Sequence, residues 1–178
     1  MQGKSKAVQY GIIGSIISIV LGIIMYIMGP DLFKNWVLSI VIWIFLIIVV
    51  TVIMSLSAGA FKKSNGGYVS FQRAFREAFI PAVIMAVVGL LFNILLMNVI
   101  DPGYTEELKV AIEEMVTTQY ENAGMSEDAI DKQLAKMEKN DQFSILGQTK
   151  STLFGLILYG VIALIIAAIV KKKNPDLV

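Results

Sequence analysis

Four long runs of apolar residues, separated by polar segments, dominate the pattern along the chain. They cover about residues 7–28, 36–60, 78–100 and 153–170. A helix rises about 1.5 Å per residue, so runs of this length match a hydrocarbon core roughly 30 Å thick. The pattern therefore predicts an all-α, polytopic membrane protein, with four transmembrane helices packed as a bundle in a single membrane domain.

The segment 101–150, between the third and fourth runs, is polar and carries eleven acidic residues against five lysines. Gly124 divides it into two stretches, each with an apolar stripe at helical spacing. The stripes consist of Tyr104, Leu108, Ala111, Ile112 and Met115, and of Ile130, Leu134 and Met137. We therefore expect a helical hairpin whose stripes pack on each other or on the bundle, because about fifty residues make too small a core alone.

Residues 68–79 precede the third run and predict an amphipathic helix in the headgroup plane. One side carries aromatic residues and the other carries charges: Phe71, Phe75 and Phe79 with Tyr68, opposite Arg73 and Arg76 with Glu77. On one interpretation the aromatic side enters the acyl boundary, and the arginines bind anionic lipid or a partner. On the other, this is the ordinary basic flank of a transmembrane span.

Small and polar residues within the spans mark candidate helix contacts. Gly14, Ser18 and Gly22 recur every four residues and would allow close approach of another helix, inside the bundle or at a homodimer seam. Asn93 carries the only side-chain amide deep in a span. We expect it to hydrogen-bond another helix, with a solute or ion ligand beside a cavity as the alternative.

Charge is unequally distributed, although the formal net charge is only +1 at pH 7. Nine basic residues lie near the termini and in the loop after the second run, with two acidic ones: Lys4, Lys6, Lys62, Lys63, Arg73, Arg76, Lys171, Lys172 and Lys173. Lys and Arg concentrate on the cytoplasmic side, so we expect cytoplasmic termini and an extracytoplasmic 101–150 segment. The first run lacks a signal-peptide cleavage pattern, and we expect it to remain as a span.

Composition supports this class and narrows the chemistry. Apolar residues make up 56% of the chain and charged residues 16%, with a mean hydropathy of +0.72, unlike an average soluble domain. There is no Cys and no His, and neither a zinc-protease motif nor a phosphate-binding loop occurs. We therefore expect no catalytic residues, metal, cofactor or nucleic-acid partner, and we expect that the protein is not an enzyme.

Two short motifs and the order of the elements resemble a known family. The chain enters the third span through Ser-Phe-Gln-Arg-Ala-Phe at 70–75 and leaves it through Ile-Asp-Pro-Gly-Tyr at 100–104, with an acidic helical insert before the last span. These features resemble the domain of unknown function 4199 family, and the resemblance extends over nearly the whole chain. It implies a four-span architecture and a bacterial inner-membrane location, but no activity and no functional residues.

Two classes of function fit these observations. The first is a non-catalytic membrane protein, an accessory subunit, assembly factor or scaffold of an inner-membrane complex. Its expected partners are lipids, including anionic ones, and another membrane protein or a second copy of itself. The alternative is a small oligomeric transporter or channel, although such proteins usually place charged side chains at membrane depth.

Overall fold

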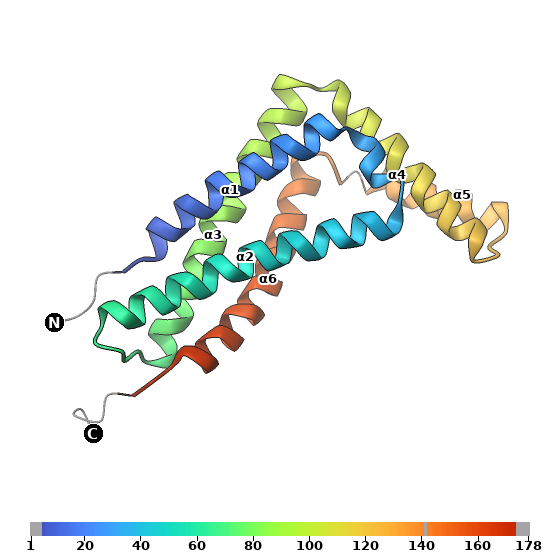
Figure 1. The fold of residues 1–178 in the computed structure, drawn as a ribbon. Coiled ribbons are helices and arrows are strands. Elements are labelled where there is room, and N and C mark those ends of the chain that lie inside the picture. Colours follow the sequence, from blue (N-terminus) through green and yellow to red (C-terminus); the bar gives the residue numbers. More distant parts are fainter. Residues whose placement is uncertain (1–4, 141, 174–178) are drawn as a thin grey trace. The chain divides into compact units, whose positions relative to one another are not determined.

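The computed structural model describes residues 5–140 and 142–173 and is almost entirely helical (Figure 1). Its elements are α1 (Ala7–Met28), a 3₁₀ turn η1 (Pro30–Phe33), α2 (Trp36–Ser64), α3 (Phe71–Leu95), a π-helical turn η2 (Leu96–Ile100), α4 (Gly103–Asn122), α5 (Glu127–Lys139) and α6 (Ile145–Val170). The described residues contain no strand beyond one isolated β-bridge. The all-α prediction is confirmed.

Four helical segments are long and apolar enough to cross a membrane: Ala7–Met28, Trp36–Ser64, Phe71–Ile100 and Ile145–Val170. The chain is therefore a multi-pass membrane protein, as its hydropathy predicts. The second helix extends to Ser64 because Lys62 and Lys63 suit the last turn of a helix. The fourth helix begins at Ile145, before the apolar run 153–170. Its first turns contain polar residues, which a hydropathy pattern does not identify as helical.

The sequence predicts a separate interfacial helix at 68–79, but most of this segment forms the first turns of α3. The helix starts at Phe71 and continues through Pro81 as one element. Pro81 lacks an amide proton, so only the Glu77 carbonyl loses its normal helical partner. Only one charge of the segment is turned inward, because Glu77 is buried inside the protein while Arg76 is exposed.

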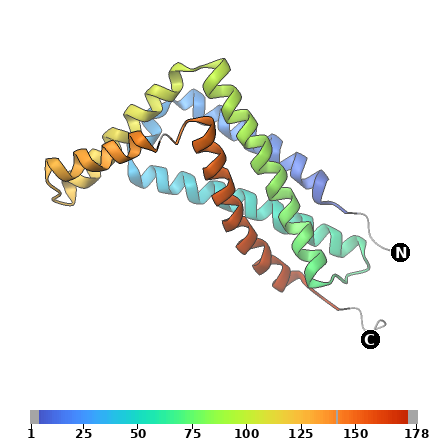
Figure 2. The ribbon, with the colours of Figure 1, turned by 180° about the vertical axis from the view of Figure 1, so that it is seen from behind.

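The chain divides into two compact units. Unit 1 comprises the described residues of 1–19, 46–89 and 152–178, and unit 2 those of 20–45 and 90–151. Within unit 1, the end of α6 lies beside the turn that leads into α3 (Figure 2).

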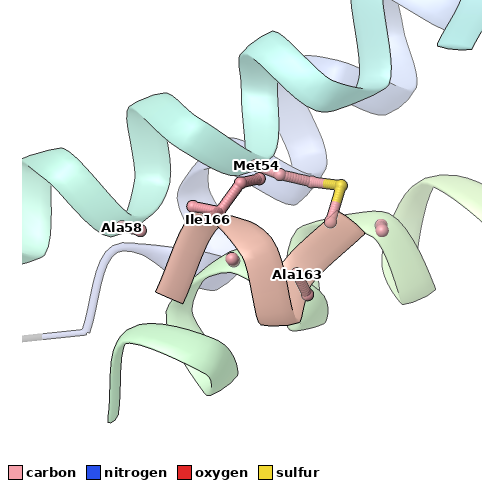
Figure 3. Packing of buried hydrophobic residues seen from close by; sticks show 6 residues of the cluster. Met54, Ala58, Ala163 and Ile166 are labelled. Carbon is pink, nitrogen blue, oxygen red and sulfur yellow. The ribbon is translucent and has the colours of Figure 1, made fainter. Parts of the chain in front are cut away.

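Small residues form much of the core of unit 1. Its largest cluster joins three helices through Met54 and Ala58 of α2, Ala78 and Ala82 of α3, and Ala163 and Ile166 of α6. Figure 3 shows Met54 and Ala58 facing Ala163 and Ile166. Alanine lets helix backbones approach closely, which is how membrane helices gain packing energy when lipid removes the hydrophobic driving force.

Aromatic residues dominate the core of unit 2. The buried side chains of Leu96, Tyr104 and Leu108 contact a partly buried set: Tyr26, Phe33, Phe92, Met97 and Phe143. Leu108 is 5% exposed, and Ile130 on α5 is also 5% exposed. The apolar stripes expected in the 101–150 segment are therefore turned away from solvent, and α4 contacts α5.

Candidate functional site

The end of α6 is joined to the turn before α3 by backbone and side chains. Val69 and Lys172 form the isolated bridge, in which each amide donates to the other's carbonyl at 2.9 Å. The ammonium of Lys172 lies 5.3 Å from the centroid of the Tyr68 ring, and that of Lys171 lies 5.9 Å from that of Phe71. We call the side chains of Tyr68, Phe71, Lys171 and Lys172 the basic clasp.

Glu77 on α3 is the most deeply buried charged residue described in unit 1, with 1% of its surface exposed. One carboxylate oxygen, Oε2, accepts hydrogen bonds from the Ser5 hydroxyl at 3.1 Å and from the amides of Lys6 and Ala7 at 3.1 and 3.2 Å. These amides stand at the start of α1, where backbone N–H groups have no partner within the helix. The carboxylate therefore caps α1 from another helix, in the position where negative charge is favoured.

Arg73, one turn before Glu77, completes this cluster. Its Nη2 lies 3.0 Å from Oε1 of Glu77, and its guanidinium lies 4.6 Å from the centroid of the Phe61 ring on α2. The buried carboxylate thus has a counter-charge as well as hydrogen bonds, which it requires inside a protein. The pair ties α1, α2 and α3 together.

Of the aromatic and arginine residues expected to contact lipid, some pack inside unit 1 and others are exposed on its surface. Phe75 and Phe79 stack at 5.4 Å between ring centroids and pack against the alanine-rich core. Phe71 and Arg76 are exposed, and Phe71 belongs to the basic clasp. The aromatic side of this segment is therefore not wholly lipid-facing, in contrast to the expectation from the sequence. Neighbouring helices of the bundle cover Phe75 and Phe79, which would contact lipid only if the helix were isolated.

Two glycines of the predicted contact stripe lie at close helix approaches. A Cβ atom at Gly14 would overlap Sδ of Met85, and one at Gly22 would stand 3.1 Å from the Phe92 ring. Ser18, between them in the stripe, is half-buried. Gly11 lies outside the predicted stripe but is also at a close helix approach. A Cβ there would stand 2.7 Å from the Ile84 side chain.

Asn93 lies on the surface of α3, which differs from the expected position between helices. Its amide makes no hydrogen bond to another of the residues that the structure describes. Asn98 is exposed as well, but its Nδ2 donates to the carbonyl of Ile94 at 2.9 Å, so its own helix supplies a partner. The direction of Asn93 depends on how the other helices pack, which its own position in the sequence does not encode.

An aspartate organises the start of α4 in unit 2. The Tyr26 hydroxyl donates to Oδ2 of Asp101 at 2.8 Å, and the Tyr104 amide donates to Oδ1 at 3.2 Å. The two tyrosine rings meet edge to face, with 4.9 Å between centroids. Burial raises the pKa of Tyr104 above its ordinary value, so its hydroxyl stays protonated at neutral pH.

Lys34 connects the turn η1 to α4. Its Nζ lies 2.9 Å from Glu114 and 3.1 Å from Asp31. Hydrogen bonds to Glu114 and then to Asp31 raise the pKa of Lys34 above its ordinary value. The side chains are substantially exposed, so these ion pairs hold geometry more than they add stability.

A cavity of about 370 Å³ lies beside α4 and α5. Its wall combines carboxylates, one lysine and apolar side chains: Glu106, Lys109, Val110, Ile112, Glu113, Met137, Glu138, Gln142 and Phe143. Lys109 pairs with Glu106 at 3.0 Å. Within residues 5–140 and 142–173, no group of three or more side chains is arranged to hold a metal ion.

Glu77 is the residue of this region that sequence reasoning assigned wrongly. On a helical wheel it falls with Arg73 and Arg76 on the polar side, which predicts a position facing water or headgroups. One signal was available, since the spacing of Arg73 and Glu77 is that of an i,i+4 ion pair. Its contact with the start of α1, some seventy residues away, has no local signal.

A family model described as "Protein of unknown function (DUF4199)" matches residues 9–172 of the chain. No curated protein and no solved structure matches it.

Proposed function

The chain belongs to the DUF4199 family of proteins of unknown function, and we propose that it is a non-catalytic accessory subunit, assembly factor or scaffold of a membrane complex. In this proposal the protein acts by holding another membrane protein through its transmembrane helices. The observation that carries the proposal is the outward-facing amide of Asn93.

An amide at membrane depth requires a hydrogen-bond partner. Asn93 stands about 6 Å along the helix from the middle of the apolar run 78–100, at 1.5 Å per residue, so its surroundings are hydrocarbon. Lipid tails offer neither a donor nor an acceptor, and the residues described here leave this amide unpaired. A polar side chain on a helix of another molecule would satisfy it, with a gain of about 0.5–2 kcal/mol.

The first part of α2 supports the same proposal. Its large apolar residues from Trp36 to Phe45 are mostly exposed, and Trp43 is 65% exposed. On a helical wheel they spread over more than half of the circumference. Such a surface suits either lipid or a helix of a partner, and tryptophan side chains supply large contact areas at protein interfaces.

The proposal includes an orientation and a location. Both termini and the 62–77 loop would face the cytoplasm of a bacterial cell, as the bias of Lys and Arg favours, and the protein would reside in the inner membrane. Residues 101–150 would then project on the extracytoplasmic side, where α4 and α5 present acidic surfaces to a second region of the complex.

Gentle detergent extraction of the native protein, followed by mass determination and identification of the bound components, tests the proposal. We expect a stoichiometric membrane-protein partner. Asn93→Leu should reduce its retention several-fold, whereas the matched variant Asn98→Leu should retain it, because the Asn98 amide is already bonded to its own helix.

Two results would contradict the proposal. Equal retention of the partner by both asparagine variants would show that Asn93 has no part in the contact. A closed homo-oligomer that conducts ions or solutes in liposomes would favour the transporter or channel alternative, with Asn93 facing its lumen.

A further inference from the structure

The described residues of unit 1 carry a basic surface with no exposed acidic side chain among them. In addition to Arg73, its described basic residues are Lys6, Lys62, Lys63, Arg76, Lys171, Lys172 and Lys173. The only acidic residue among its described positions is Glu77, which is buried and paired with Arg73. Because the Glu77 carboxylate is already bonded to Arg73 and to the start of α1, it does not neutralise the lysines on the surface of unit 1.

The basic clasp fixes two of these lysines more firmly than a flexible tail would. The backbone bridge between Val69 and Lys172 holds the segment after α6 in place, while aromatic rings lie beside both ammonium groups. Among the residues described, neither Lys171 nor Lys172 takes part in an ion pair. Their charges are therefore positioned but electrostatically uncompensated.

The clasp also lies at the ends of membrane-crossing helices, where we expect lipid headgroups. Lys171 directly follows the last residue of α6, and Phe71 is the first residue of α3, so all four side chains stand at the ends of membrane-crossing helices. Aromatic rings favour the interfacial region, and lysines there attract the phosphates of anionic lipids.

We propose that Lys171 and Lys172, positioned by Tyr68 and Phe71, bind the headgroup of an anionic phospholipid. The lysines contact the phosphate, while the rings restrict the ammonium groups and border the acyl chains. This inference goes beyond the proposed contact with a membrane protein, which involves Asn93. It also changes the site expected from the sequence, because Arg73 is engaged with Glu77 and the lysines after α6 take its place.

Native mass spectrometry of the full-length protein in mild detergent provides the test, after titration with phosphatidylglycerol or with phosphatidylcholine of the same acyl chains. We expect preferential retention of phosphatidylglycerol. A lysine near an anionic membrane surface contributes about fivefold in binding, so Lys171→Gln with Lys172→Gln should weaken retention about 25-fold. The backbone bridge does not require these side chains, and an unchanged circular dichroism spectrum would verify the fold.

The matched control is Lys132→Gln with Lys136→Gln on α5, which removes the same charge from another helix. It should leave phosphatidylglycerol retention unchanged. Phe71→Leu with Tyr68→Leu should weaken retention a few-fold, because the lysines keep their charge but lose their positioning rings.

Three results would overturn the proposal. The first is equal retention of phosphatidylglycerol and phosphatidylcholine by the unaltered protein. The second is an equal loss in the α5 control, since this would show an effect of total charge. The third is displacement of the lipid by soluble glycerol phosphate at a similar concentration, which would indicate a site for a free phosphate compound.

Discussion

Unit 1 and unit 2 are stabilised by different means. Unit 1 packs alanines and glycines at close helix approaches and has one ion pair with a buried carboxylate, Arg73–Glu77. Unit 2 packs aromatic side chains around Asp101 and has its ion pairs on the surface, as between Lys34 and Glu114. The sequence of unit 1 has nine basic and two acidic residues, and that of unit 2 has six basic and twelve acidic residues.

Part of this difference reflects surroundings, because most of unit 1 lies in membrane-crossing helices, whereas unit 2 combines parts of such helices with the polar helices α4 and α5. In hydrocarbon, apolar burial gives no advantage over lipid, so close contact between small residues and a satisfied buried charge hold the helices together. Unit 2 also contains α4 and α5, which lie outside the membrane-crossing segments; there the burial of large apolar side chains is favourable, and exposed carboxylates need no partner.

Replacement of Glu77 by alanine should have the largest effect. The substitution removes the counter-charge of Arg73 and the acceptor of three donors at the start of α1. We expect a loss of about 2–4 kcal/mol in the free energy of unfolding, measured by denaturant titration in detergent with circular dichroism. Glu121→Ala, at an exposed position of unit 2, is the control and should have little effect; equal effects would refute a special role for the buried carboxylate.

A methyl group at Gly14 should have the next largest effect. Gly14→Ala would bring a Cβ into overlap with Met85 Sδ and within 3.1 Å of Ile53 Cγ2, so the helices would have to separate or Met85 would have to change rotamer. We expect a cost of about 1–3 kcal/mol in the same unfolding assay. Gly59→Ala is the matched control in the same unit, because a Cβ there meets nothing within 4 Å. If both variants unfold alike, close packing at Gly14 does not stabilise unit 1.

Loss of the Tyr26 hydroxyl should have a smaller and more local effect in unit 2. Tyr26→Phe removes the 2.8 Å hydrogen bond to Asp101 and leaves the ring contact with Tyr104. We expect a cost of about 1–2 kcal/mol, seen as faster hydrogen exchange in the first turns of α4. Tyr120→Phe on the same helix should leave this exchange unchanged. Faster exchange spread evenly over both units would mean that Asp101 does not act locally.

Much of the fold follows from hydropathy and periodicity. The apolar runs locate the four membrane-crossing helices, and the stripes containing Leu108 and Ile130 identify the buried sides of α4 and α5. These features are local, since a helix is recognised from neighbouring residues and an apolar stripe from its spacing. The ends of α2 and α6 are less predictable, because polar residues can continue a helix without an apolar signal.

The candidate site is less predictable, because its contacts join distant parts of the chain. Helical spacing places Glu77 near Arg73, but only the packed structure brings the start of α1 to its carboxylate. In the same way, Asn93 is recognisable as an amide in a span, yet its outward direction follows from the arrangement of the other helices. The clasp pairs Val69 with Lys172, and neither residue carries a local signal for the other.

The bridge between Val69 and Lys172 determines when the basic clasp can form during biosynthesis, because it joins residues synthesised at different times. The turn containing Val69 leaves the ribosome with the second and third spans, whereas Lys172 follows the last residues of the fourth. The clasp is therefore completed only after the fourth helix has been synthesised and inserted. A chain truncated before α6 would keep Tyr68 and Phe71 but would lack both lysines, so this surface distinguishes a finished protein from an unfinished one.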